Sequence, residues 1–218
     1  MFHRIRKLLF PPKCVLCHKL LQKEETDLCV HCRENAPVAT NTKFRFSFVA
    51  DWTAVWYYKD NVRESLLRFK FCKARSYASV YGQFLAMRLQ TLGKDHFDVL
   101  TWVSTGARRV RKRGYDHAKL LALAVAKELG VPAVKTLKKI RHTPPQSSLH
   151  SAAERRANVL GAYQVLRKDL VAGKHVLLLD DIITTGATAS ECARTLLSAG
   201  AAKITVATVA VATDQTKE

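Results

Sequence analysis

Residues 175–188 read HVLLLDDIITTGAT, and this stretch decides the fold of the chain. Its first half is a short apolar run, which predicts a strand buried on both faces of a parallel sheet. Two adjacent carboxylates, Asp180 and Asp181, come next, followed by a turn of small and hydroxyl-bearing residues. In residues 187–200 the apolar side chains recur at helical spacing. The stretch therefore predicts a strand, an acidic pair, a turn and a helix in succession.

The turn between this strand and this helix is suited to a phosphate group. Backbone N–H groups at a helix N-terminus lack intrahelical partners and carry partial positive charge, so they attract anions. The two carboxylates end the strand, at the edge where open α/β sheets place their ligands. An ordinary strand–loop–helix unit with an acidic turn is the alternative interpretation. Neither G-x-x-x-x-G-K-[ST] nor G-x-G-x-x-G occurs in the chain, so a P-loop and a dinucleotide-binding site are not indicated.

The run from Val176 to Thr188 resembles the motif with which type I phosphoribosyltransferases bind phosphoribosyl diphosphate (PRPP). That motif consists of apolar residues, two acids, and then Thr-Thr-Gly-small-Thr, and the match is unbroken. The resemblance implies that Asp180 and Asp181 contact the 2′- and 3′-hydroxyls of a ribose. It also implies that the turn cradles the 5′-phosphate, through Thr184, Thr185, Gly186, Ala187 and Thr188.

A second motif consists of two cysteine pairs near the N-terminus. Eleven residues separate Cys14-x2-Cys17 from Cys29-x2-Cys32. Two C-x2-C pairs near this spacing predict a tetrahedral, structural zinc site, with each pair on a tight turn called a knuckle. The metal would staple a segment of about 35 residues that is too small for a core of its own. The alternatives are disulfides, which a cytoplasmic chain disfavours, haem attachment at residues 14–18, and a ligand exchange with His18 or His31.

Basic residues outnumber acidic residues two to one. The 36 Lys and Arg and the 18 Asp and Glu give a formal net charge of +18, and such an excess points to polyanionic partners. Residues 103–119 hold six Lys or Arg against one acidic residue, and residues 135–156 hold six against one as well. The charge thus gathers before the acidic motif, where a diphosphate or a nucleic acid would lie. A solvated basic surface without a partner is the alternative.

The rest of the chain predicts an α/β architecture. Strands are expected at 49–58, 97–103, 134–140, 160–165 and 203–210, and helices at 61–71, 76–92, 117–129 and 152–158, the third helix capped by Asp116. This alternation predicts a doubly wound, mainly parallel sheet. We expect a zinc-ribbon module with its exit linker at 1–48, an α/β domain at 49–218, and a loop at 104–115. No apolar run approaches the ~20 residues of a membrane helix, and the N-terminal apolar run is too short for export, so we expect a cytoplasmic protein without membrane insertion.

The order of the motifs extends the resemblance over nearly the whole chain. After the cysteines come Arg-Lys-Arg-Gly-Tyr at 111–115, then Arg141-x-Thr143-x2-Gln146, and last the PRPP motif. This order is similar to that of the ComF family, whose members are associated with DNA uptake in naturally competent bacteria. Family members commonly carry prolines after the second strand and an Asn-Gln pair after the Gly-aromatic pair. The chain departs from both patterns, with Ser104-Thr105-Gly106 and Asp116-His117.

The resemblance also implies a chemistry for the α/β domain. A catalytic domain would displace diphosphate from PRPP at the anomeric carbon, with Mg²⁺ held by diphosphate and ribose oxygens. The candidate catalytic residues are Asp180, Asp181 and Arg141. The diphosphate would be held by backbone amides of Ser104, Thr105 and Gly106, helped by Arg108 or Arg109, and the loop at 141–146 would close over the ligand.

Two classes of function fit these residues. One is a ComF-like protein that binds PRPP or a related ligand with Mg²⁺ in DNA uptake or repair, with single-stranded DNA and a DNA-uptake helicase or other competence proteins as partners. The other is a metabolic phosphoribosyltransferase for an unidentified base or amine; no acceptor site is visible, so turnover is left open. The residues expected to contact DNA are Arg108, Arg109, Arg111, Lys112 and Arg113. Trp102, Tyr115 and Tyr163 offer stacking surfaces in principle, although most aromatic residues are expected in the core.

Overall fold

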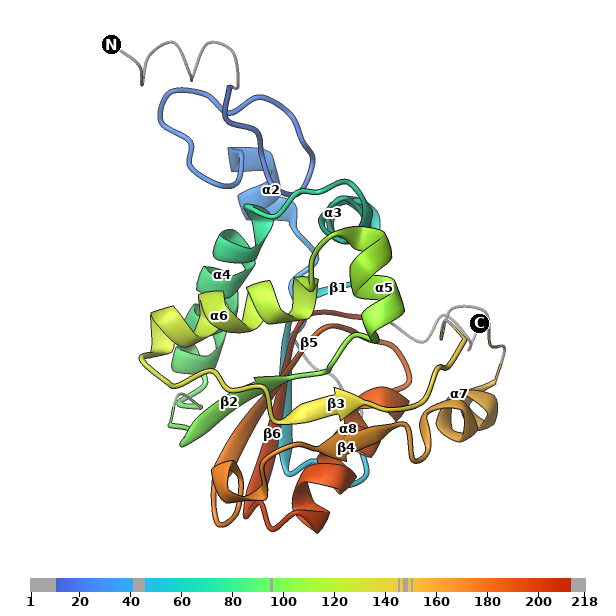
Figure 1. Cartoon of the computed structure of the whole chain (residues 1–218). Coiled ribbons are helices and arrows are strands. Elements are labelled where there is room, and N and C mark those ends of the chain that lie inside the picture. Colours follow the sequence, from blue (N-terminus) through green and yellow to red (C-terminus); the bar gives the residue numbers. More distant parts are fainter. Residues whose placement is uncertain are drawn as a thin grey trace.

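The computed structural model describes residues 11–40, 46–94, 96–144, 146, 149 and 151–212. The start of the expected zinc-ribbon module (1–10), part of its exit linker (41–45), the end of the expected α/β domain (213–218), and Pro145 of the loop expected to close over the ligand lie outside these ranges. At the centre is a sheet of four parallel strands in the order β1-β6-β5-β2 (Figure 1). The strands are β1 (Asp51–Tyr57), β2 (Val99–Trp102), β5 (His175–Ile183) and β6 (Lys203–Val211).

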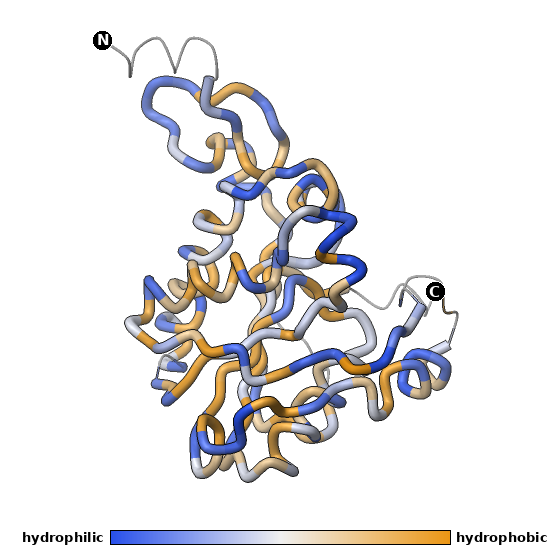
Figure 2. The backbone as a smooth tube through the Cα atoms, in the orientation of Figure 1, coloured by the Kyte–Doolittle hydropathy of each residue, from blue (hydrophilic) through white to orange (hydrophobic). Residues whose placement is uncertain are grey.

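Both faces of this sheet are covered, as the apolar strand pattern predicts. Leu177 and Leu179 of β5 belong to a core that includes residues of α3, α4 and α6, whereas Val176 and Leu178 belong to a second core with residues of α8. In Figure 2 the strands of the sheet are mostly hydrophobic along their length, whereas α5 is hydrophilic. The doubly wound, mainly parallel sheet is therefore confirmed. These helices are α3 (Asp60–Phe71), α4 (Tyr77–Thr91), α5 (Ala107–Arg113), α6 (His117–Leu129) and α8 (Ala187–Ser198).

A small antiparallel ribbon stands apart from the main sheet. It pairs β3 (Leu137–Lys139) with β4 (Tyr163–Val165). Between them the chain forms α7 (Ala152–Val159), which begins with a capping box, and after them a 3-10 turn, η2 (Lys168–Leu170). The strands expected at 134–140 and 160–165 are therefore present but shorter than predicted.

The segment before α6 corrects one prediction. Residues 104–115 are not a continuous loop, because α5 occupies their centre. Alanine, arginine and lysine favour helix, and the three basic residues of the last turn complement the negative end of the helix dipole. Gly114, with φ of 78°, ends α5 in the left-handed conformation. Asp116 then caps α6 as predicted, accepting a hydrogen bond from the Lys119 N–H at 3.2 Å.

The N-terminal cysteine module shares its core with the α/β domain. Leu16 and Leu28 of the module belong to the same buried cluster as Val62 and Leu66 of α3. Its short helix is α2 (Val30–Asn35). The segment after α2 continues onto the edge of the sheet, where the Ala39 N–H donates to the Val55 carbonyl of β1 at 2.9 Å. The module is therefore packed against the larger domain rather than tethered to it.

Across the described ranges, no helix is long and apolar enough to cross a membrane.

Candidate functional site

The turn expected to cradle a phosphate lies between β5 and α8. Gly186 has a φ of 73° and precedes the first residue of α8, so the free N–H groups of the first helical turn face outward. A side chain at Gly186 would collide with the ring of Phe46, which is buried beside Trp52. Glycine is thus required here twice, for its backbone conformation and for the space that Phe46 occupies.

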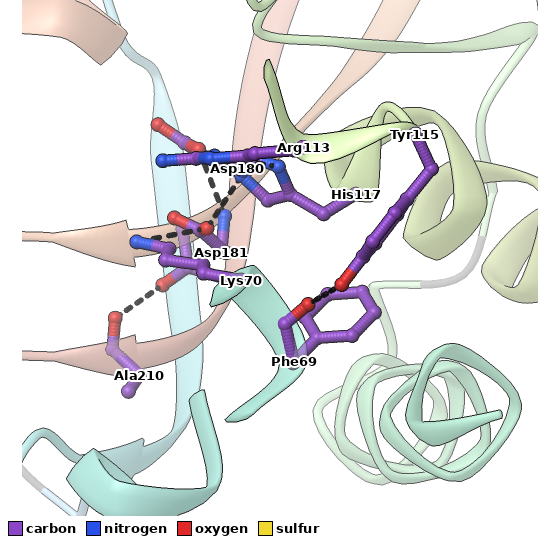
Figure 3. A network of polar contacts seen from close by, with 9 residues as sticks. Phe69, Lys70, Arg113, Tyr115, His117, Asp180, Asp181 and Ala210 are labelled. Carbon is purple, nitrogen blue, oxygen red and sulfur yellow. Dashed lines mark hydrogen bonds and ion pairs between the residues drawn. The ribbon is translucent and has the colours of Figure 1, made fainter. Parts of the chain in front are cut away.

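Asp181, at the carboxyl-terminal end of β5, is a buried carboxylate with two side-chain partners. Its Oδ2 lies 2.9 Å from Lys70 Nζ of α3 and 2.8 Å from His117 Nε2 of α6 (Figure 3). Burial alone would favour the neutral acid, but Lys70 and His117 hold the pKa of Asp181 well below its usual range. Arg113 Nη1 lies 3.0 Å from His117 Nδ1. The same nitrogen lies 3.5 Å from His117 Nε2, so the guanidinium lies against the imidazole that faces Asp181.

The pKa of Asp180 is shifted in the opposite direction from that of Asp181. Burial and the neighbouring charge of Asp181 raise its pKa well above the usual value for an aspartate. Its Oδ1 accepts a hydrogen bond from the backbone N–H of Asp181 at 2.8 Å. The acidic pair therefore consists of one carboxylate that is firmly ionised and one that takes up a proton readily.

A cleft of about 790 Å³ brings most of the predicted residues together. It is lined by the turn at 184–188, by Asp180 and Asp181, and by the three residues of the expected diphosphate loop, Ser104, Thr105 and Gly106. The basic side chains in its lining are Lys70, Lys73, Arg109, Lys112, Arg113 and Lys139. Within the described residues, Asp180 and Asp181 are the only carboxylates in this lining, so the cleft is suited to a ligand with several negative charges.

Three of the predicted residues do not line this cleft. Arg141 donates to the carbonyls of Asn158 at 3.0 Å and Leu160 at 2.8 Å. It lies with Arg108 in the wall of a smaller pocket of about 150 Å³ beside the β3–β4 ribbon. Arg111 is exposed on α5. Arg141 thus holds the chain around α7 in place, and its proposed catalytic role has no geometric support.

The ribbon side of the cleft contributes Lys139, which the sequence did not single out. Lys139 Nζ donates to Thr143 Oγ1 at 2.6 Å and lies 5.5 Å from the ring centroid of Tyr163. Burial, together with the charge of Arg109, lowers the pKa of Lys139 to about 8. Gln146 Nε2 donates to Thr188 Oγ1 at 3.3 Å. These contacts tie the ribbon and the segment after it to the phosphate turn.

Of the aromatic residues that line the cleft, Tyr58, Phe71 and Tyr163, Phe71 is the most exposed. The ring is 62% exposed, and the guanidinium of Arg113 lies 4.8 Å from its centroid. Trp102, Tyr115 and Tyr163 are instead buried in the core, as the sequence suggested for most aromatic residues. A planar ligand group would therefore meet Phe71 rather than these three.

The four predicted zinc ligands converge. The Sγ atoms of Cys14, Cys17, Cys29 and Cys32 all lie within 4.8 Å of one another, and Cys17 Sγ and Cys29 Sγ are 3.6 Å apart. Tetrahedral zinc with Zn–S bonds of about 2.3 Å requires sulfur atoms roughly 3.8 Å apart. The cluster therefore fits a structural zinc ion with four thiolate ligands.

Both predicted parts of the chain have matches among known protein families. Residues 117–218 match the family described as phosphoribosyl transferase domain, and residues 5–43 match the double zinc ribbon domain. The chain is 35% identical over 97 residues to Competence protein F of Haemophilus influenzae and 27% identical over 202 residues to Competence protein ComFC of Bacillus subtilis. These matches support the resemblance to the ComF family.

The extent of these matches differs among the relatives. The match to the Haemophilus protein covers 44% of this chain and 42% of the relative. DNA utilization protein YhgH of Salmonella typhimurium is 32% identical over 134 residues, 61% of this chain and 58% of the relative. The match to the Bacillus protein covers 87% of this chain and 79% of the relative. The matched region thus spans about half of the length of the first two proteins.

The first prediction from this geometry concerns zinc. Protein purified without added metal should contain about one zinc per chain, measured by elemental analysis. Because the cysteine module shares its core with α3, Cys14→Ser should release the metal and also lower the unfolding temperature of the whole protein. Cys72→Ser, at an exposed cysteine outside the cluster, is the control and should do neither. Metal-free wild-type protein, or haem absorption, would contradict the assignment.

The second prediction separates the two carboxylates by stability. The folded-state pKa of Asp181 is depressed, so its ionised form stabilises the fold above the unfolded pKa of about 4. Asp181→Asn should therefore cost about 3 kcal/mol at pH 7, roughly 6–12 °C in Tm. The folded-state pKa of Asp180 is raised, so its ionisation at pH 7 opposes folding, and Asp180→Asn should raise Tm.

Thermal unfolding between pH 3 and pH 8 measures both effects. The gain from Asp180→Asn should vanish as the pH falls to about 4, because Asp180 is then protonated in the folded state and increasingly so in the unfolded state. The loss from Asp181→Asn should shrink as the pH falls below 4. If Asp180→Asn and Asp181→Asn changed Tm in the same direction at pH 7, the opposite pKa shifts assigned to the two carboxylates would be refuted.

Proposed function

We propose that this ComF-like protein binds a phosphoribosyl ligand such as PRPP, together with Mg²⁺, and does so in the handling of DNA during uptake or repair. The supporting observation is the cleft, where the turn at 184–188, the acidic pair and six basic side chains surround one space. The match to the phosphoribosyl transferase domain covers Asp180, Asp181 and the turn. The 5′-phosphate would lie on the first turn of α8, with the sugar hydroxyls on the carboxylates.

Mg²⁺ fits this proposal as a companion of the ligand. Magnesium in proteins commonly binds one or two carboxylates and takes its other ligands from phosphates and water. Asp181 already accepts from Lys70 and His117, which leaves Asp180 as the freer carboxylate. The ion would thus be held mainly by oxygens of the ligand, and it would neutralise charge on the diphosphate.

The DNA part of the proposal rests on the relatives and on the surface of the cleft. The relatives named above are called competence and DNA utilization proteins. Lys73, Lys112 and the exposed ring of Phe71 lie in the same lining as the phosphate turn. Cations that follow a phosphate backbone and an aromatic ring that stacks on bases are the elements with which proteins bind single strands. We place the protein in the cytoplasm, with a DNA-uptake helicase or other competence proteins as partners.

Transfer of the phosphoribosyl group to a base or amine is the second candidate function. The observation that favours it is Lys139, a cation on the ribbon opposite the acidic pair in the same cleft. In such a reaction the bond from the anomeric carbon to diphosphate breaks, a bond to the acceptor nitrogen forms, and the acceptor loses a proton. Release of diphosphate from PRPP and Mg²⁺ in the presence of a panel of bases and amines would support this function.

The third prediction tests the phosphoribosyl ligand. PRPP with Mg²⁺ should raise the Tm of the wild type, because a ligand that binds only the folded state stabilises it. Asp180→Asn should reduce the shift strongly, since Asp180 contributes to ligand binding without holding the fold together. Gly186→Val is a poorer test, because the side chain would collide with Phe46. Asp169→Asn, on the exposed η2 turn, is the matched control; a shift equally reduced by both substitutions would refute the site.

The fourth prediction tests single-stranded DNA. Affinity should fall with salt at a slope of roughly −0.7 per contacted phosphate. Replacing Arg111 and Lys112 with alanine should flatten the slope by one to two contacts, whereas alanine at the exposed Lys127 and Lys135, outside the cleft, should change it less. A salt-independent affinity would exclude the electrostatic account.

A second substitution tests base stacking in the same DNA-binding assay. Phe71→Ala should weaken DNA binding by about 1–3 kcal/mol, whereas Met87→Ala, which removes a similarly exposed apolar side chain from α4, should not. Excess PRPP should compete with DNA if the two share the cleft. Salt-dependent binding that is untouched by PRPP and by Phe71→Ala would place the DNA on another face.

A further inference from the structure

Helix α3 connects the zinc knuckle with the acidic pair. In Figure 1 it lies at the lower right of the cysteine module, next to α5. Ser65 Oγ of α3 donates to the Val15 carbonyl at 2.5 Å. Arg68 Nη2 donates to the carbonyl of Leu16 and lies 3.3 Å from that of Val15. Asn61, one helical turn before Ser65, has its Nδ2 3.9 Å from Cys32 Sγ.

The two acceptor carbonyls belong to the metal-binding turn itself. Val15 and Leu16 stand between Cys14 and Cys17, and their side chains are 4% and 1% exposed. A metal ion bound to both cysteines fixes the path of the chain between them. The carbonyls that hold α3 are therefore in place only while the knuckle is formed.

The last turn of α3 reaches the acidic pair. Phe69 is fully buried, and its carbonyl accepts a hydrogen bond from the Tyr115 hydroxyl (Figure 3). Lys70, the next residue, makes the 2.9 Å ion pair with Asp181. Three consecutive residues of α3 thus contact three different parts of the protein. Arg68 contacts the knuckle, Phe69 the segment before α6, and Lys70 the acidic pair.

We propose that Arg68 is a positioning residue that makes the phosphoribosyl site depend on the zinc knuckle. Anchored by Arg68, the end of α3 keeps Lys70 against Asp181. When the anchor is lost, Lys70 withdraws and Asp181 retains His117 as its one side-chain partner. The ligand-binding part of this inference rests on the proposed function, whereas the movement of Lys70 does not.

Withdrawal of Lys70 has a definite effect on the cleft. Asp181 is only 4% exposed, and a buried carboxylate that loses a cation becomes easier to protonate. A protonated Asp181 has less acceptor capacity and no negative charge, so it accepts hydrogen bonds from sugar hydroxyls more weakly. Loss of the knuckle should thus weaken a phosphoribosyl ligand although no cysteine touches the cleft.

Arg68→Ala with zinc still bound is the main test. Zinc content and Tm confirm that the variant is folded and loaded. Its affinity for PRPP with Mg²⁺ should fall roughly tenfold, about the value of one charge-assisted hydrogen bond, and Arg68→Lys, which keeps a charged nitrogen donor, should recover part of it. The matched control is Arg88→Ala, because Arg88 of α4 also donates to a main-chain carbonyl, that of Ala39, at 2.7 Å, but lies outside the lining of the cleft.

A double-mutant cycle shows whether Arg68 acts through Lys70. Lys70→Ala alone should weaken the ligand, and adding Arg68→Ala to it should produce little further loss. Additive losses, or an equal loss in Arg88→Ala, would overturn the proposal.

A measurement without ligand separates this proposal from the proposed function. Nitrogen NMR of the His117 ring reports the Asp181 contact directly, because Nε2 lies 2.8 Å from the same oxygen that Lys70 approaches. Arg68→Ala should shift these ring signals toward those of Lys70→Ala, and Arg88→Ala should leave them unchanged. If PRPP binds to no variant but the shift appears, the proposed function fails and the coupling stands; if the shift is absent, the coupling fails.

Discussion

A carboxylate buried at the end of a strand has to be neutralised by groups from elsewhere in the chain, and the cleft is arranged around this requirement at Asp181. Lys70 comes from α3 and His117 from α6, and Arg113 at the end of α5 orients the imidazole. Three helices that are separate in sequence are thereby fixed relative to β5. The same contacts leave Asp180 as the more adaptable member of the pair.

Among the described residues, the side chains that line the cleft include six Lys or Arg but only two carboxylates. The pKa of Asp180 is raised and that of Lys139 is lowered to about 8, because burial disfavours the charged form of both side chains. Clustered cations repel one another, and this repulsion opposes folding. A phosphate placed among them would favour the charged ammonium of Lys139, which couples ligand binding to uptake of a proton. A site built to attract anions in this way gives up some stability until an anion arrives.

The parts of the site that could be predicted are those written in contiguous sequence. The strand, acidic pair, turn and helix occupy one unbroken stretch, and the cysteine pairs have a spacing that few other structures use. Lys70 and His117 could not be paired with Asp181 in advance, because the pairing depends on how α3 and α6 pack. The Asp116-His117 departure from the family pattern was a visible signal, but nothing in sequence indicated what His117 contacts. Helix α5 was missed because seven residues dominated by arginine and lysine carry almost no apolar periodicity.

The buried ring of Phe46 has a consequence for how this protein can be divided. Phe46 precedes the first strand of the α/β domain, yet it fills the space beside Gly186 and packs on Trp52. A chain trimmed to begin at residue 49, the natural cut between the two sequence motifs, would keep every residue of the phosphate turn and lose the support beneath it. The boundary of the unit that supports this turn therefore does not coincide with the boundary of the sheet, because Phe46 lies outside the sheet and packs against the turn.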